Sequence, residues 1–193
     1  MEGVNVTLHR LLPAEFSMYA PQLVDIYIEA MGYDPHVRRN RIAAWRSEVT
    51  QPGFTAILAQ TESTVVGVAY GFLGSPDTWW DRQLRRGFEA HGGIDEARRD
   101  ILTSYFELAE IHVSPVCQGH GIGKLLLHEL LWNVPARHVL LSTPEVEGEG
   151  NRAFGLYRSE GFTDILRHYY YPGDTRPFAI LGARLPLDSA RKC

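Results

Sequence analysis

A short glycine-rich segment constrains this chain more than any other feature, because it joins a strand-like run to a helix-like run. The segment is Gln118-Gly119-His120-Gly121-Ile122-Gly123, with Val113 ahead of it and Lys124 directly after it. The first main-chain N–H groups of a helix have no internal acceptors and carry partial positive charge, so such a turn can bind a phosphate. Glycines keep side chains out of the way of that approach. The pattern predicts an anion site built from main-chain amides.

Two common phosphate-binding motifs do not fit this spacing. A P-loop would require Gly at position 118 and Ser or Thr at position 125, where the chain has Gln118 and Leu125. The dinucleotide fingerprint would require a glycine at the position of Lys124, and it would be expected near the first strand. Neither motif is therefore indicated.

The segment resembles the acetyl-CoA signature of the GNAT superfamily, an Arg or Gln followed by x-x-Gly-x-Gly or Ala. A second block, from Asn151 to Phe162, resembles the family's other landmark, Asn-x-x-Ala-x-x-Leu-Tyr-x-x-x-Gly-Phe. The two blocks lie in the expected order, about thirty residues apart, as a strand-helix-strand unit requires. The resemblance implies a mixed α/β fold with a largely antiparallel central sheet of about seven strands. It also implies a splayed sheet where acetyl-CoA enters, and a single domain over residues 1–193 with an insertion at about 75–104.

The same resemblance implies direct transfer of an acetyl group from acetyl-CoA to an amine. In the family, the amide at the position of Val113 binds the acetyl carbonyl, and the tyrosine at that of Tyr157 reaches the departing sulfur. A phenol of pKa about 10 can donate a hydrogen bond or proton to a thiolate whose thiol has a pKa of about 8.5. The alternative is that Tyr157 is an ordinary core aromatic residue. The residues implied to contact acetyl-CoA are Ile111, Val113, Gln118, Gly119, His120, Gly121, Ile122, Gly123, Lys124, Asn151, Phe154 and Tyr157.

An alkyl ammonium must lose a proton before its nitrogen can attack, so a base or an ordered water is expected. Glu107 lies where histone-acetylating relatives carry their catalytic glutamate and is the first candidate, with Glu110 and His112 in reserve. Alternation along the strand would put Glu107 on the face of Ala109, and Glu110 on the face of His112. A charged residue at a strand end is the alternative for each, because active-site carboxylates differ from others only in environment.

The end of the chain bears on the acceptor. The run Arg167 to Pro172 resembles the end of enzymes that acetylate protein N-termini, where a tyrosine pair lies beside the acceptor. Tyr169 and Tyr170 are therefore candidate acceptor contacts. Those enzymes carry an acidic pair before the last strand, however, where this chain has Arg176-Pro177. The acceptor amine is accordingly left as that of a small molecule or of a protein.

Two tryptophans, Trp79 and Trp80, lie in the inserted segment. Aromatic side chains on long connections often contact ligands, so both are candidates for a wall or lid of the acceptor pocket. A separate hydrophobic cluster or a contact in a homodimer is the alternative. The eight histidines include no His-Glu-x-x-His pattern, and no metal site is expected.

The remaining composition limits the class and the compartment. A net charge of −4 argues against a nucleic-acid partner, and the chain has no run of about twenty apolar residues that would span a membrane. Cys117 and Cys193 form no Cys-x-x-Cys pair, which fits a reducing compartment, so we expect a cytoplasmic protein. The competing class is a GNAT-like module that binds acyl-CoA without turnover. The presence of both Glu107 and Tyr157 favours an enzyme.

Hydrophobic periodicity predicts the elements themselves. Strands are expected at residues 4–10, 54–60, 65–73, 105–113, 138–142, 163–171 and 178–185. Helices are expected around 23–30 and 37–49, on either side of His91-Gly92-Gly93, at 122–130, and after a cap at Asn151.

Overall fold

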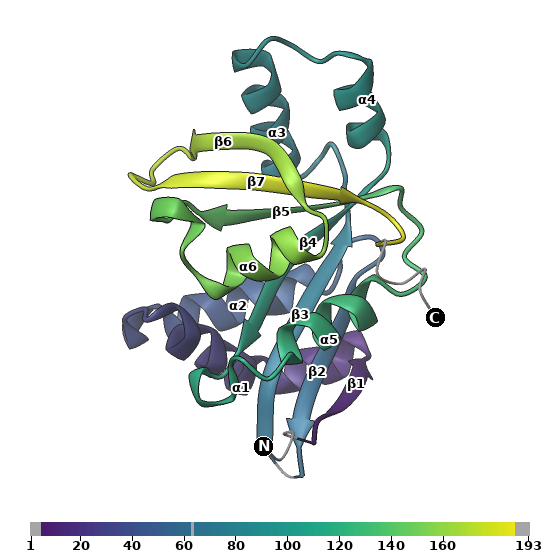
Figure 1. Cartoon of the computed structure of the whole chain (residues 1–193). Coiled ribbons are helices and arrows are strands. Elements are labelled where there is room, and N and C mark those ends of the chain that lie inside the picture. Colours follow the sequence, from purple (N-terminus) through teal and green to yellow (C-terminus); the bar gives the residue numbers. More distant parts are fainter. Residues whose placement is uncertain (1–4, 63, 188–193) are drawn as a thin grey trace. The chain divides into compact units, whose positions relative to one another are not determined.

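The computed structural model of the chain describes residues 5–62 and 64–187 (Figure 1). Within this part, seven strands are hydrogen-bonded in the order β1-β2-β3-β4-β5-β7-β6. The pairs β1–β2, β2–β3, β5–β7 and β6–β7 are antiparallel, whereas β4 and β5 run parallel. The predicted mixed and largely antiparallel sheet is confirmed.

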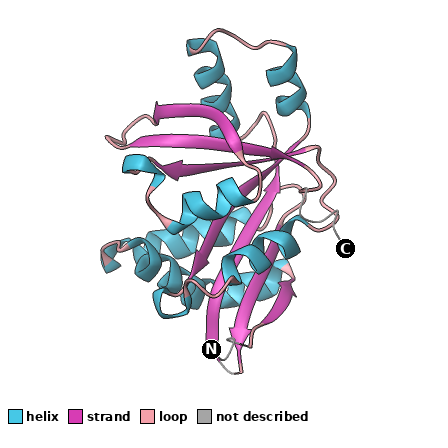
Figure 2. Cartoon of the chain, viewed as in Figure 1, coloured by secondary structure: helices cyan, strands magenta, loops and turns pink. Residues whose placement is uncertain are grey.

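Figure 2 distinguishes the strands from the helices of the chain. The strands are β1 (Thr7–Leu11), β2 (Thr55–Thr61), β3 (Thr64–Leu73), β4 (Tyr105–Val113), β5 (His138–Pro144), β6 (Thr163–Tyr170) and β7 (Pro177–Arg184). The helices are α1 (Pro13–Met31), α2 (Arg38–Glu48), α3 (Trp79–Ala90), α4 (Glu96–Thr103), α5 (Ile122–Leu131) and α6 (Arg152–Ser159).

Two boundaries near the N-terminus differ from the prediction. The first strand begins at Thr7, and Val4, where it was expected to start, lies outside the described residues. Helix α1 begins ten residues before Leu23, at Pro13, because proline suits the first turn of a helix and the Glu15 carboxylate accepts the Leu12 N–H over 2.7 Å. Pro21 lies inside α1 without ending it.

The chain divides into two compact units, and the first comprises Met1–Phe72 and Leu108–Trp132. Helices α1 and α2 lie against the strands of this unit, as Figure 1 shows. Phe16 of α1 and Trp45 of α2 both pack edge-on against the Tyr70 ring, with ring centroids 5.0 and 5.1 Å apart. All three side chains are essentially buried, so aromatic packing holds the two helices on the sheet.

The second unit comprises Leu73–Glu107 and Asn133–Cys193, and the inserted segment is part of its core. Leu84 and Phe88 of α3 are buried with Leu166 of β6. At Gly87, a Cβ atom would lie 2.4 Å from the Leu166 side chain, so α3 approaches β6 more closely than any other residue would allow.

Local capping explains why the insertion forms two helices. The Thr78 hydroxyl accepts the N–H of Asp81 over 3.2 Å at the start of α3, and the Asp95 carboxylate accepts that of Arg98 over 2.8 Å at the start of α4. Between them, Gly92 and Gly93 have φ of 103° and 89°, a region that favours glycine. The two helices predicted on either side of His91-Gly92-Gly93 are confirmed.

Candidate active site

The glycine turn of the first unit is fixed to the end of β4 by its own side chain. The amide Nε2 of Gln118 donates to the Val113 carbonyl over 3.0 Å. Gly119 and Gly121 then have φ of 83° and 80°, so both turn the chain with left-handed backbone that other residues adopt at a cost. The side chain of Gln118 thus serves the turn itself.

Helix α5 begins at this turn without a side-chain cap. Gly121 is the N-cap residue, and a Cβ atom built there meets no heavy atom within 4 Å. The first intrahelical bond runs from Leu125 N to the Gly121 carbonyl over 3.1 Å, so the first main-chain N–H groups of α5, such as those of Ile122 and Gly123, have no acceptor within the helix. Ile122 anchors the turn because its side chain is buried. The residues present therefore fit the diphosphate of a CoA thioester.

The second motif begins at Asn151, in the second unit. Its Oδ1 atom accepts the Phe154 N–H over 2.9 Å and caps α6, as predicted. The Phe154 ring is completely buried, so the side chain serves the core. Tyr157 is only 6% exposed and its ring lies 5.7 Å from that of Phe162, so it is at least a core aromatic residue.

Glu107, also in the second unit, lies on β4 where this strand pairs with β5 opposite Leu140. Burial raises the pKa of Tyr171 to about 12, and the negative charge of Glu107 adds to this increase. The Tyr171 hydroxyl donates to Ser142 Oγ over 2.8 Å and accepts from the Trp80 indole over 2.9 Å. The charge of Glu107 thus acts on two tyrosines, Tyr171 and Tyr105.

The tyrosine pair expected at the acceptor is split by the structure. Tyr169 is buried and its hydroxyl donates to Gln83 of α3 over 3.0 Å, whereas Tyr170 is 58% exposed. Trp79 is half exposed, and its ring lies 5.4 Å from that of Tyr171. Trp79, Trp80 and Tyr171 therefore form one aromatic group.

A buried carboxylate that the sequence did not reveal joins α3 to β4. Asp81 is fully buried, accepts a hydrogen bond from the Tyr105 hydroxyl over 2.8 Å, and pairs with Arg85 over 2.5 Å. Burial and this carboxylate raise the pKa of Tyr105. No local pattern signals the contact, because 24 residues separate the partners.

The reserve candidates Glu110 and His112 form a pair in the first unit. Glu110 Oε2 lies 2.6 Å from His112 Nε2, and the His112 ring meets the Tyr27 ring edge-on at 5.0 Å. Ala109 packs against the hydrophobic cluster that contains Tyr27. Glu110 and His112 therefore face α1.

A second acidic group lies close to this pair. The Tyr70 hydroxyl donates to the Glu48 carboxylate of α2. Burial raises the pKa of Glu48, and the charge of Glu110 raises it further. The Arg41 guanidinium lies over the Tyr27 ring at 5.0 Å. Glu110 thus belongs to a coupled polar cluster in which one carboxyl group, that of Glu48, binds its proton more tightly than usual.

Among residues 5–62 and 64–187, no group of three or more His, Cys, Asp or Glu side chains could hold a metal ion. Among the helices described there, none has the length and apolar character needed to cross a membrane.

No protein-family model matches the chain. It is 38% identical over 199 residues to the GCN5-like protein acetyltransferase Rv2170 of Mycobacterium tuberculosis, covering 92% of this chain and 97% of that protein. An acetyltransferase of the GNAT family from Desulfovibrio desulfuricans has the same fold, with a TM-score of 0.63 and 15% identity over 93% of this chain and 99% of that one. The yncA acetyltransferase of Salmonella typhimurium, solved with acetyl-CoA, also has this fold. Its TM-score is 0.58 and its sequence identity is 16%, over 94% of each chain.

The fold, the glycine turn and the relatives together define this protein as an acyltransferase. The chain belongs to the GNAT superfamily of acetyltransferases, as its two motifs predict.

Proposed function

We propose that this chain is an N-acetyltransferase that transfers the acetyl group of acetyl-CoA to an amine of a protein or peptide. The observation that carries the proposal is the start of α5, where two glycines in left-handed conformation lead into a helix that has no side-chain cap, as a diphosphate site requires. The name of the Mycobacterium tuberculosis relative, a protein acetyltransferase, supports a protein acceptor over a small molecule.

The donor would be held mainly by main-chain groups. The amides from Gly119 to Lys124 would bind the diphosphate, and the amide of Val113 would donate to the acetyl oxygen as it gains charge. When bound, acetyl-CoA supplies a thioester carbon open to attack and a thiolate leaving group. Asn151 would act by capping α6 and so fixing the second motif.

Two proton transfers then complete the reaction. Glu107 would accept the proton that the acceptor ammonium loses, so that its nitrogen can form the new C–N bond. As the C–S bond breaks, Tyr157 would donate a proton to the thiolate. Glu110, paired with His112, or an ordered water is the second candidate for the base.

The acceptor would lie against Trp79, Trp80 and Tyr171, which contact one another and include a tyrosine on which the charge of Glu107 acts. Aromatic faces and a carboxylate together attract a cationic amine. Tyr170, which is exposed, is the further candidate contact.

A cytoplasmic location and a homodimer remain predictions. The same holds for the expectation that the protein needs no metal ion and binds neither nucleic acid nor a membrane.

The test is acetyl transfer by the purified chain. We would incubate it with acetyl-CoA and three acceptor sets: peptides with a free N-terminus, N-terminally blocked peptides with lysine, and small amines. Released thiol and the mass of the product report turnover, and we expect it with at least one peptide set. Turnover of small amines alone would contradict the proposal that the acceptor is a protein or peptide. Binding of acetyl-CoA without turnover of any amine would instead indicate an acyl-CoA-binding module.

A further inference from the structure

The pairing of β6 with β7 shifts register twice, and the second shift, between Leu166 and Tyr169, adds one residue to β6. Leu166 lies opposite Ile180 and Tyr169 opposite Phe178, so three steps along β6 match two steps along β7. His168, inside this bulge, has φ of 51°, in the left-handed region that few residues other than glycine adopt.

The bulge decides which tyrosines face inward. Side chains alternate along a strand, so in a regular β6 the face of Leu166 would also carry His168 and Tyr170. Instead, Tyr169 lies in the same buried cluster as Leu166, with Tyr171 packed against it, whereas Tyr170 is exposed.

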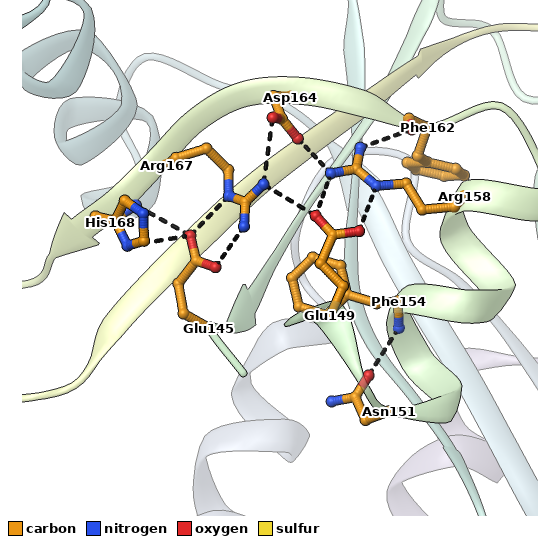
Figure 3. A network of polar contacts seen from close by, with 9 residues as sticks. All are labelled: Glu145, Glu149, Asn151, Phe154, Arg158, Phe162, Asp164, Arg167 and His168. Atoms are coloured by element: carbon orange, nitrogen blue, oxygen red, sulfur yellow. Dashed lines mark hydrogen bonds and ion pairs between the residues drawn. The ribbon is translucent and has the colours of Figure 1, made fainter. Parts of the chain in front are cut away.

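The carboxylate of Glu145 holds the bulge, as Figure 3 shows. It accepts the His168 N–H over 3.1 Å and two bonds from the Arg167 guanidinium, each of 2.7 Å. The main-chain N–H of Glu145 donates to the Pro177 carbonyl of β7 over 2.9 Å. Glu145 therefore fixes β6 through its side chain and β7 through its backbone. Its side chain is only 7% exposed.

The same network reaches the loop before α6. Arg167 also donates to Glu149 over 2.9 Å, and Glu149 accepts two bonds from Arg158, of 2.6 and 2.9 Å (Figure 3). Glu149 has φ of 55°, so this network contacts two residues with left-handed backbone, Glu149 and His168. Such conformations persist where surrounding contacts determine them.

The two inner tyrosines are the ones that bind the inserted helix. The Tyr169 hydroxyl donates to Gln83, and the Tyr171 hydroxyl accepts from Trp80, both on α3. If β6 lost its bulge, Tyr170 would face inward and both bonds would be lost.

We propose that Glu145 is a positioning residue: by holding the bulge at His168, it places Tyr169 and Tyr171 against α3 and so determines which acceptor amines are accepted. The acceptor part of this inference rests on the proposed N-acetyltransferase function, whereas the placement of α3 does not.

The first test is structural and needs no turnover. Glu145→Gln keeps the size of the side chain but cannot accept two charge-assisted bonds from Arg167. Glu145→Ala removes the acceptor for Arg167 and also the acceptor for the His168 N–H. Glu147→Gln is the matched control, because Glu147 lies two residues away in the same loop and is exposed. We expect hydrogen exchange to quicken in β6 and α3 of both Glu145 variants and not in the control. Unchanged exchange in Glu145→Ala would overturn the proposal.

The second test separates acceptor from donor. In both Glu145 variants the KM for the peptide acceptor should rise about tenfold or more, because small displacements in a binding pocket are costly. The KM for acetyl-CoA should stay at the wild-type value. An equal rise in both KM values would overturn the positioning role. If the wild-type chain turns over no amine, the proposed function fails by itself, and hydrogen exchange alone decides on Glu145.

Discussion

The indole N–H of Trp80 donates to the hydroxyl of Tyr171 over 2.9 Å, which joins helix α3 to the end of β6 across 91 residues of sequence. Because Tyr171 also donates to Ser142, its hydroxyl is held on both sides. The position of the Tyr171 ring thus depends on the inserted segment.

Trp80→Phe should therefore weaken acceptor binding. The substitution leaves the Tyr171 hydroxyl without its donor, at a cost of about 1 kcal/mol, or about fivefold in the acceptor KM. Steady-state kinetics with varied peptide would measure the change. Trp132→Phe, at a position that is 70% exposed, is the control and should leave the acceptor KM unchanged. Equal effects of the two substitutions would count against an acceptor wall at Trp80.

Gly121→Ala should weaken acetyl-CoA binding. With φ of 80°, alanine is strained there by about 1 kcal/mol, and its methyl group projects into open space at the start of α5. Loss of one charge-assisted bond would cost about 1.5–3 kcal/mol, or roughly 10-fold to 100-fold in Kd by calorimetry. Gly32→Ala is the control, because Gly32 has φ of 65° and open surroundings, so alanine is similarly strained there. This variant should bind acetyl-CoA as the wild type does.

Tyr157→Phe tests the proton donor. We expect kcat to fall about 100-fold while calorimetry shows unchanged acetyl-CoA affinity, because the ring still packs beside Phe162. Tyr19→Phe, at a partly exposed site on α1, controls for the loss of a hydroxyl. Wild-type turnover in Tyr157→Phe would assign this residue to the core alone.

Glu107→Gln tests the base. An amide cannot take a proton, so kcat should fall about 100-fold at neutral pH and recover as rising pH supplies free amine. Initial rates from about pH 6 to about pH 10 would show this slope. Glu110→Gln is the comparison, and we expect it to keep the wild-type profile. The opposite pattern would move the base to the Glu110–His112 pair.

Acid should remove the contribution of Glu145 to stability. Hydrogen bonds from Arg167 lower the pKa of Glu145 from 4.5 to about 2. Because the pKa is lower in the folded state, the stabilisation is complete when the pH is above the pKa of the unfolded state. It is lost as the pH falls toward the pKa of the folded state. In urea unfolding, wild type should exceed Glu145→Gln in stability at neutral pH, and the difference should shrink between about pH 4.5 and about pH 2. A constant difference over this range would contradict the ion pair.

Local patterns in the sequence were sufficient for the elements and for the glycine turn. Alternation, caps such as Asn151, and glycine spacing act between near neighbours, so they can be read without a structure. The inward orientation of Tyr169 and Tyr171 could not be predicted from the sequence, because the bulge at His168 reverses the faces of β6 and Glu145, which holds the bulge, lies 23 residues away. The same holds for the bond between Glu48 and Tyr70.

Gly87 gives the inserted segment a further meaning for engineering. Because a Cβ there would collide with Leu166, the helix and the strand beneath it have to be exchanged together. Grafting residues 75–104 into another acetyltransferase would carry over the tryptophans without the tyrosines that receive them. Any attempt to transplant acceptor preference should therefore move α3, β6 and the loop bearing Glu145 as one block.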